Sequence, residues 1–402
     1  MSLKRGRKFL NTPGPTNVPD RVLNAMHRQT LDLSDPDFLN ASKSCFLDMR
    51  KMIRTQGEVF LYACNGHGAW EAALMNVFSP GDKILVPESG NFSQAWQDMA
   101  EALGLVIKSL PGDWRRALRA EAVEEMLKSD KEGEIKGVLL VHTDTATSVT
   151  CDIPAVRSAI DAVGHPALLI VDTIATLGTI EYRMDEWGVD VTVSASQKGM
   201  MMAPGLGIVA ANKKALAAHE TAEMPRRYWD WKTRMEAAHY RKFCGTAPQL
   251  MVFGLREALD MILEEGLETA FERHRALAGA TQAAVEVWGQ AGTMSLNAIE
   301  PSERSMGVTT IRTADGIDAD ELRVICRDEM MAGLGGGLGI LEGKAFRIGH
   351  MGDMNAPMLY GALGAVESTF GYLDIPHASG GVTAAVQYIT HSKKQTTGTI
   401  TY

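Results

Sequence analysis

The stretch Ala167-Leu168-Leu169-Ile170-Val171-Asp172 decides the fold, because an unbroken aliphatic run ends there in an acid. Such a run is typical of a strand buried on both faces of a sheet. The next run, Val189-Asp190-Val191-Thr192-Val193, is mostly β-branched and leads through Ser194–Gln197 into Lys198. Since open α/β sheets bind ligands at the carboxyl ends of their strands, we expect the Asp172 carboxylate and the Lys198 amine to converge there.

An acid and a lysine at one sheet edge indicate a particular chemistry. Pyridoxal phosphate needs an acid beside its pyridinium nitrogen and a lysine for a Schiff base. Taken alone, Asp172 is more often a helix cap or solvated acid, and Lys198 a surface lysine. Their shared position favours the cofactor, and burial or nearby cations would lower the pKa of Lys198 enough for it to lose its proton.

The same alternation along the chain predicts the fold class. Short apolar runs alternate with helical patterns from about residue 20 to residue 270, which indicates an α/β fold with a mostly parallel, seven-stranded sheet flanked by helices. Besides the two runs above, strands are expected at 59–63, 84–86, 104–107, 137–141 and 207–210.

Three parts are expected along the chain. Prolines and glycine make residues 8–20 an irregular segment, so residues 1–20 form an N-terminal arm. Residues 21–275 form the large α/β domain, which ends in a helical stretch that begins near residue 249. Residues 276–402 form a smaller C-terminal α+β domain, with strands at 307–312 and 344–348, a helix at 319–331 and a glycine-rich turn at 333–339.

Composition limits the binding partners and the cellular compartment that we expect for this chain. The 402 residues carry a formal net charge of −9 without a long block of like charge, which argues against nucleic acid or an anionic membrane as the main partner. No apolar run of about 20 residues occurs, so no membrane span is expected. The five cysteines are scattered without a CxxC motif, which does not indicate a disulfide framework or a metal site and favours a cytoplasmic location.

Three further motifs each have two interpretations. Asn65-Gly66-His67-Gly68-Ala69-Trp70-Glu71 joins a strand to a helix, and the new helix offers backbone N–H groups to a phosphate, although many α/β turns are equally rich in glycine. Phe92 either stacks on a cofactor ring or packs in the core. The hydroxyl-rich segment 142–148 either binds a phenolic oxygen or is an ordinary Ser/Thr turn.

An arginine in a late apolar strand is the last candidate. Arg347 lies in Phe346-Arg347-Ile348-Gly349-His350, where burying its charge is costly without an anion. It either clamps a substrate carboxylate through two hydrogen bonds or forms a structural ion pair.

In this order, the motifs resemble the serine/alanine–glyoxylate aminotransferase family, within the class V group of fold-type I pyridoxal phosphate enzymes. The resemblance spans nearly the whole chain and is carried by segments 13–19, 66–71, 184–190, 196–199 and 347–352. It implies a homodimeric enzyme that moves an amino group from a small amino acid, such as serine or alanine, to a small 2-oxo acid, most often glyoxylate or else pyruvate.

The resemblance also implies roles for individual residues. Lys198 would carry the cofactor and shuttle a proton, Asp172 would pair with the ring nitrogen, and Phe92 would stack on the ring. Thr145 would contact the phenolic oxygen and Arg347 the substrate carboxylate. The remaining implied contacts are with the phosphate or cofactor (Gly66, His67, Gly68, Gln197), with the phosphate across a dimer interface (Thr246) and with the substrate (Gly14).

The chain departs from the family pattern in three places. Leu33-Ser34 replaces an aromatic or histidine and an arginine, in a segment that approaches the partner's site in this family. Thr143-Asp144 and Ser148 stand where relatives tend to have Asn-Glu and Gly, and 173–176 replaces a small residue followed by Val-Ser-Ser. The expected cofactor contacts are kept, whereas the substrate-facing residues differ.

Two other functions stay open at this point. One is a related enzyme on the same scaffold that uses another donor, such as aspartate, or is a lyase or desulfurase. A desulfurase needs a reactive cysteine on a mobile loop, whereas Cys326 lies on the expected apolar face of a helix. A non-catalytic binding protein would have no need of both Lys198 and Asp172.

Overall fold

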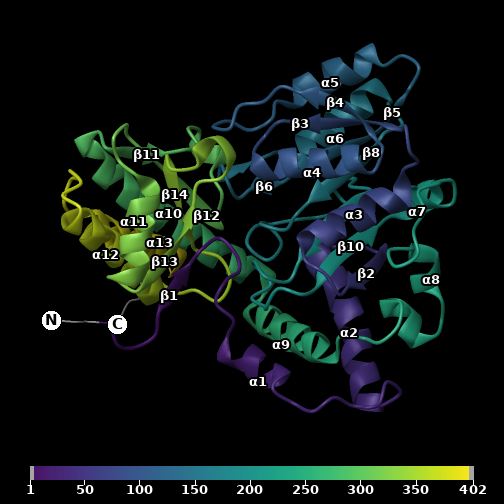
Figure 1. Cartoon of the computed structure of the whole chain (residues 1–402), viewed down its shortest axis with the longest axis horizontal. Helices are drawn as coiled ribbons and strands as arrows, with labels where there is room; N and C mark the ends of the chain where they lie inside the picture. Colours follow the sequence, from purple (N-terminus) through teal and green to yellow (C-terminus); the bar gives the residue numbers. More distant parts are fainter. Residues whose placement is uncertain (1–3, 398–402) are drawn as a thin grey trace.

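The computed structural model describes residues 4–397 and consists of two lobes, shown in Figure 1. Residues 1–3 and 398–402 of the predicted arm and small domain lie outside this range. The larger lobe contains a seven-stranded sheet in which β10 alone runs antiparallel to its neighbours, so the predicted α/β class is confirmed. The strand order is β2 (Glu58–Tyr62), β10 (Gly207–Ala211), β9 (Val191–Ala195), β8 (Leu168–Asp172), β5 (Ile135–Val141), β3 (Lys83–Pro87) and β4 (Val106–Leu110).

Apolar side chains of the sheet alternate between two cores, one on each face. In β5, Val138 and Leu140 face one core, whereas Leu139 and Val141 face the other. This alternation explains why the central strands are aliphatic throughout. The first core is closed by α2 (Pro36–Ile53), α5 (Ala120–Ser129), α6 (Ile153–Val163) and α9 (Gln249–Glu265), and the second by α3 (Gly66–Val77), α4 (Asn91–Ala102) and α7 (Lys213–His219).

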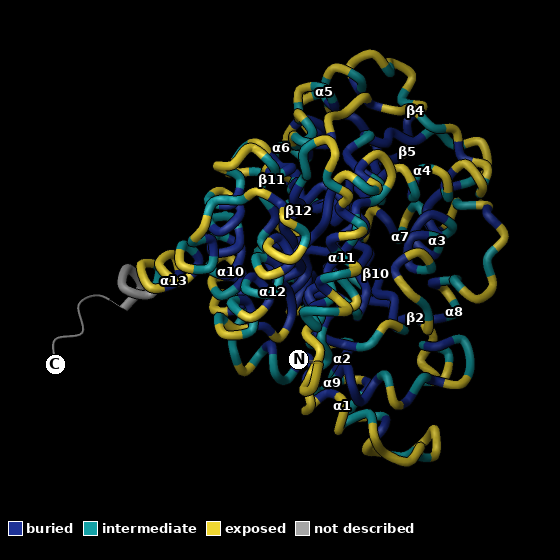
Figure 2. Tube along the Cα trace, turned by 60° about the vertical axis from the view of Figure 1, so that its left-hand side comes forward, coloured by how far each residue is buried: buried dark blue, intermediate teal, exposed yellow. Residues whose placement is uncertain are grey.

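The smaller lobe is built on a five-stranded sheet. Its order is β1 (Phe9–Asn11), β13 (Ala332–Gly336), β14 (Ala345–Gly349), β12 (Val308–Thr313) and β11 (Met294–Leu296). Its core, which includes Trp288, Phe346 and Phe370, also takes side chains from α10 (Leu267–Trp288), α11 (Ala319–Asp328), α12 (Ala356–Tyr372) and α13 (Gly381–Thr397). Figure 2 shows exposed surface on outer helices such as α5 and α13, around a buried interior.

Two local predictions are wrong. The arm is not irregular throughout, because Phe9–Asn11 forms β1 and pairs in parallel with β13 at the edge of the small sheet. The glycine-rich stretch at 333–339 is not simply a turn, because its first part lies in β13. Glycine is needed in that strand, since a Cβ at Gly335 would lie 2.7 Å from Pro13 Cδ and 3.1 Å from Arg347 Cβ.

The predicted division at residue 275 stays a prediction and falls inside α10. The long helical stretch from residue 249 is broken at Gly266, whose φ of +84° suits glycine. Shorter elements complete the described chain: α1 (Asp20–Met26), β6 (Thr143–Asp144), β7 (Val149–Thr150), α8 (Trp231–Met235), η1 (His239–Phe243), η2 (Gly289–Ala291), η3 (Pro301–Glu303) and η4 (Gly339–Leu341). Within residues 4–397, no helix combines the length and apolarity that crossing a membrane requires.

Candidate active site

A cavity of about 290 Å³ lies at the carboxyl edge of the large sheet. Asp172 ends β8, Val141 ends β5 and Lys198 follows β9, so three strand ends contribute to its wall. Its volume is close to the lower end of the roughly 300–1,000 Å³ typical of small-molecule pockets. Eight predicted site residues line it: Gly14, Gly66, His67, Phe92, Thr145, Asp172, Gln197 and Lys198.

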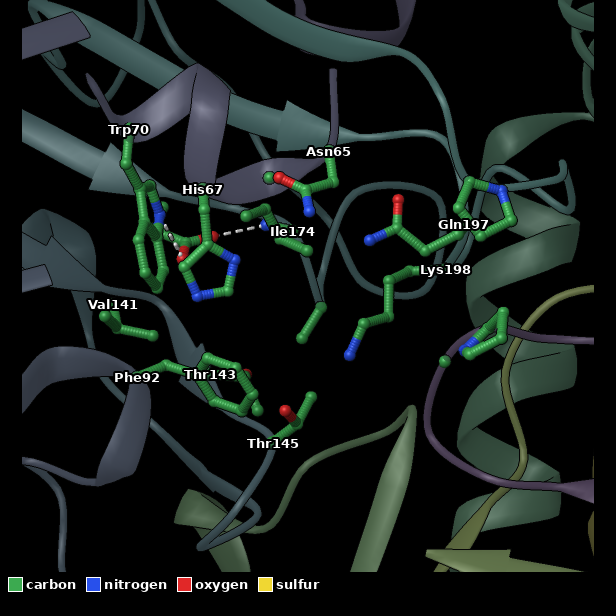
Figure 3. Close-up of a pocket in the computed structure, with 16 residues that line it drawn as sticks. Asn65, His67, Trp70, Phe92, Val141, Thr143, Thr145, Ile174, Gln197 and Lys198 are labelled. Carbon is green, nitrogen blue, oxygen red and sulfur yellow. Dashed lines mark hydrogen bonds between the residues drawn. The ribbon is translucent and has the colours of Figure 1, made fainter. Parts of the chain in front are cut away.

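The Asp172 carboxylate is buried, and two neutral N–H groups hold it. Its Oδ1 accepts the Ile174 backbone N–H at 2.6 Å, and its Oδ2 accepts the Trp70 indole N–H at 2.9 Å, both drawn in Figure 3. Burial raises the pKa of Asp172 to about 7, although both hydrogen bonds and the nearby Lys198 amine oppose this rise. A cationic group inside the cavity would therefore stabilise the charged carboxylate.

The Lys198 side chain reaches into the same cavity, as Figure 3 shows. Its Nζ donates a hydrogen bond to the Pro13 carbonyl oxygen and lies 5.8 Å from the centre of the Phe92 ring. Burial, followed by repulsion from the Arg347 guanidinium, lowers the pKa of Lys198 to about 8. The amine is therefore closer to losing its proton near neutral pH than an exposed lysine is.

Gly14 allows the arm to lie directly against Lys198. It has a φ of +107°, and a Cβ there would stand 2.4 Å from Lys198 Cδ. The arm is fixed by Thr16, whose N–H donates to the Gln197 carbonyl and whose hydroxyl donates to the Lys198 carbonyl, each at 3.1 Å. Any side chain at position 14 would thus displace the lysine or the arm.

The first turn of α3 closes another side of the cavity. The Asn65 side chain caps this helix by accepting the Gly68 N–H at 3.3 Å, and Gly66 and His67 line the cavity. The first N–H groups of a helix have no acceptor within it and favour an anion. Gly68 does not line the cavity, because it faces Cys64, whose Cβ would be 2.7 Å from an added Cβ.

Phe92 is positioned by a buried acid on another segment. The Asp144 carboxylate accepts the backbone N–H groups of Phe92 at 2.7 Å and Ser93 at 3.2 Å, and so caps α4 from outside the helix. Asp144 belongs to the β6–β7 hairpin that also brings Thr143 and Thr145 to the cavity. The hairpin therefore sets both the Thr145 side and the Phe92 side of the cavity.

Arg347 stands beside the cavity rather than in its wall. It comes from β14 in the small lobe, and it lines an adjoining cavity of about 480 Å³ that shares Gly14. Its Nε donates to the Gly336 carbonyl at 2.6 Å and its Nη1 to the Thr145 carbonyl at 3.0 Å. A guanidinium has five N–H groups, so others remain for a carboxylate.

The predicted residue Thr246 and the cysteine considered for a desulfurase, Cys326, lie away from the cavity. Thr246 is exposed and does not line the cavity of its own chain. Cys326 is fully buried in α11, and burial raises the pKa of its thiol to about 11, which is unfavourable for a reactive cysteine.

Sequence reasoning gave no role to Trp70, Asp144 or Ile174. A signal existed for Trp70, because positions 66, 67 and 70 share one face of a helix and two of them were already candidates. No local pattern marks Asp144 as a cap of a helix that begins more than fifty residues earlier.

A mostly parallel α/β sheet with a lysine and an acid at its carboxyl edge, beside a second α+β lobe, defines a fold-type I pyridoxal phosphate transferase. The chain belongs to the aminotransferase class-V family, whose model matches residues 8–337. It is 41% identical to a serine–glyoxylate aminotransferase of Methylorubrum extorquens, over 96% of each chain. It is 39% identical to an L-aspartate–glyoxylate aminotransferase of Paracoccus denitrificans, over 93% of this chain and 94% of that one.

A solved structure agrees with this placement. The ureidoglycine–glyoxylate aminotransferase of Bacillus subtilis superimposes with a TM-score of 0.88 at 26% identity, covering 97% of this chain and 100% of the other. The predicted resemblance, fold class and aminotransferase activity are therefore confirmed, and the cofactor of the family is pyridoxal phosphate.

The residues around the cavity fit that cofactor. A buried carboxylate held by neutral donors suits a pyridinium nitrogen, and the open end of α3 suits a phosphate. Within residues 4–397, the buried Gln197 Oε1 has no hydrogen-bond partner, which leaves the amide with unused capacity beside the cavity. Lysine, acid, aromatic ring and helix terminus are thus all present around one space of suitable size.

Proposed function

We propose that this enzyme transfers an amino group from a small amino acid to a small 2-oxo acid, most often glyoxylate, or pyruvate. The observation that carries the proposal is the meeting of Lys198 and Asp172 in one buried cavity, with the Arg347 guanidinium beside it. The names of the two relatives above, both glyoxylate aminotransferases, support glyoxylate as the acceptor.

Each part of the cavity would hold one part of the cofactor. Lys198 would hold the aldehyde carbon, Asp172 the ring nitrogen and Phe92 one face of the ring. Thr145 would contact the phenolic oxygen, and the phosphate would lie against the first turn of α3 and Gln197. Bound there, pyridoxal phosphate supplies a ring that withdraws electrons from the substrate α-carbon.

Lys198 and Arg347 would act on the substrate. Because its pKa is lowered to about 8, Lys198 can serve as the general base that removes the α-proton and the acid that returns it. Arg347 would bind the α-carboxylate through N–H groups not used by Gly336 and Thr145, and so fix the α-carbon near the amine.

A panel of donors and acceptors tests this function. Serine, alanine and aspartate would each be paired with glyoxylate, and serine and aspartate also with pyruvate, and the product amino acid measured by chromatography. We expect glycine to form from glyoxylate with at least one donor. If neither glycine nor alanine forms in any pairing, the proposed reaction is wrong.

We also propose a homodimer located in the cytoplasm. The exposure of Thr246 away from its own cavity supports a residue that reaches the partner's site, and five free cysteines support a reducing compartment. Light scattering on the active enzyme tests the dimer, and a purely monomeric active species would contradict it.

A further inference from the structure

A hydrogen bond joins Trp70 to Asp172, the residue expected to bind the cofactor's ring nitrogen. Trp70 lies in the second turn of α3, is buried and lines the cavity. Its indole Nε1 donates to Asp172 Oδ2 at 2.9 Å, and an indole N–H can only donate. The bond therefore requires an acceptor oxygen at that position and favours the ionised carboxylate.

The indole has little freedom to turn away from the carboxylate. Trp96 stacks on it with ring centres 5.6 Å apart and planes 15° apart. His67 and Phe92 pack against it with ring centres at 4.6 Å and 6.3 Å. A ring held among three others delivers its N–H in a fixed direction, so the carboxylate is held in one orientation as well.

The second bond to the carboxylate has a different origin. Oδ1 accepts the backbone N–H of Ile174, which is two residues away and is set by the turn after β8. Trp70 is thus the side chain that fixes Oδ2, and it does so from a different element of the large lobe.

We propose that Trp70 is a positioning residue that orients Asp172 and favours its ionised form for the ring nitrogen of the cofactor. It acts through Asp172 and does not itself need to touch the reacting atoms. The inference rests on the proposed use of this cavity for pyridoxal phosphate. It adds that the affinity for the cofactor depends on one indole N–H.

The chain provides a matched control in Trp96. It is as buried as Trp70 and stacks on it, yet within the described residues its Nε1 has no hydrogen-bond partner. Trp70→Phe and Trp96→Phe therefore remove the same atoms from the same aromatic pair, and only the first removes a hydrogen bond to Asp172.

The first measurement is the affinity of the cofactor-free protein for pyridoxal phosphate, measured by equilibrium ultrafiltration. We expect Trp70→Phe to weaken binding roughly 10- to 100-fold, as for the loss of a hydrogen bond to a charged group. Trp96→Phe should stay within about threefold of the wild type, well below that range. Equal losses in the two variants would overturn the inference.

The second measurement is the dependence of this affinity on pH, which a loss of packing alone would not move. The indole N–H lowers the pKa of Asp172, so its removal should shift the acid limb of the affinity profile to higher pH in Trp70→Phe only. The charged groups that also act on Asp172 are Lys198 and Asp144, and His67 packs on Trp70; all are unchanged in both variants. An unshifted acid limb in Trp70→Phe would overturn the inference.

A third variant covers the case in which Trp70→Phe fails to fold. Benzothienylalanine at position 70 keeps the shape of the indole and replaces the N–H by sulfur, and it should give the same loss and the same shift. Wild-type affinity in that protein would overturn the inference. A wild-type chain that binds the cofactor but transfers no amino group would refute the proposed function alone, because the binding comparison would still decide the role of Trp70.

Discussion

Two sides of the cavity are held in different ways. The sheet-edge cluster, which comprises Trp70, Asp172 and Lys198, belongs to the large lobe and is fixed by bonds within it and by the arm. The hairpin segment, residues 143–150, also belongs to the large lobe in sequence, but its backbone is held by the small lobe. Four consecutive carbonyl oxygens of this segment accept hydrogen bonds from the small lobe at 2.9–3.0 Å. The Thr145 carbonyl accepts from Arg347 and the Ala146 carbonyl from the Thr310 hydroxyl. The Thr147 carbonyl accepts from the Asn297 amide and the Ser148 carbonyl from the Ser305 N–H.

Ser148 adds to the contact between the hairpin segment and the small lobe, in a backbone conformation that costs glycine less energy. Its φ of +56° is costly for a residue with a Cβ, by roughly 1–2 kcal/mol. Its hydroxyl oxygen accepts the Thr310 N–H at 3.1 Å, which offsets part of that cost and adds a further bond to the small lobe. This gives a physical reason for a serine at a position where the resemblance implies a glycine.

Because the two sides of the cavity are held by different lobes, we expect mutations on one side to affect cofactor chemistry and mutations on the other to affect substrate binding. Changes in the sheet-edge cluster should affect the cofactor or the proton transfer, since in the proposed function Asp172 would face the ring nitrogen and Lys198 would move the proton. Changes in the small lobe should act on Arg347, either directly or through the Thr145 carbonyl to which it donates, and so mainly on the substrate. The predictions below test this separation.

Lys198→Ala should have the largest effect, because it removes the proposed general base and the amine that would hold the cofactor. We expect the transfer rate to fall by at least about 10³-fold, near the upper part of the range for acid–base catalysis. Single-turnover product formation measures it, with Lys213→Ala on the exposed start of α7 as the control. Substantial transfer by Lys198→Ala would contradict the central assignment.

Arg347→Lys should change substrate binding more than cofactor binding. Lysine keeps the charge but cannot form two parallel hydrogen bonds with a carboxylate, so KM for both the amino donor and the oxo acid should rise roughly 10- to 100-fold. The affinity for the cofactor should change less than threefold, well below the expected rise in KM.

The control for Arg347 is Arg312→Lys, at a half-buried position in the neighbouring strand β12. Its KM values should match those of the wild type. A rise in KM of the same size in both variants, or a main effect of Arg347→Lys on cofactor affinity, would remove the proposed separation.

Asp172 should make the stability of the cofactor-free protein depend on pH. Its pKa is about 7 in the folded chain and about 3.9 when unfolded, so between these values the folded chain binds a proton that the unfolded chain lacks. The free energy of unfolding should then fall as pH rises from about 4 to about 7, by at most about 1.4 kcal/mol per pH unit from this group.

Asp172→Asn lacks this titration and serves as the comparison. Denaturant unfolding of both proteins across that pH window should show the variant gaining stability relative to the wild type as pH rises. A constant difference would mean that burial does not raise the pKa of Asp172.

The sheet-edge cluster could be anticipated from sequence because its signals are local. Asp172 ends one buried strand and Lys198 comes three residues after the next, and the structure places both at the same cavity. The strands themselves are marked by apolar runs, which the requirement for burial on both faces imposes on the sequence. For Thr145 and Arg347, in contrast, the residues alone left two interpretations open, and the family resemblance favoured one of them.

The links between distant segments could not be anticipated. The pairing of β1 with β13 joins segments more than 300 residues apart and uses backbone groups, which no side-chain pattern reveals. The bonds from Asn297 and Thr310 to the hairpin segment span at least 150 residues, and each residue alone resembles an ordinary polar side chain. The direction of the Trp70 N–H depends on three neighbouring rings and on the turn after β8.

The smallest expected effect comes from two adjacent threonines of β12. The Thr310 hydroxyl donates to the Ala146 carbonyl at 3.0 Å, whereas the Thr309 hydroxyl contacts His350 Nε2 at 2.9 Å within the small lobe. Valine at either position removes one buried hydrogen bond of a similar kind, so each variant should lose about 1 kcal/mol of unfolding free energy. Only Thr310→Val loosens the hairpin segment, and its KM for the amino donor should rise roughly fivefold, which corresponds to about 1 kcal/mol. If Thr309→Val raised KM equally, the small lobe would act on the substrate through its general stability, and the hairpin segment would lose its distinct role.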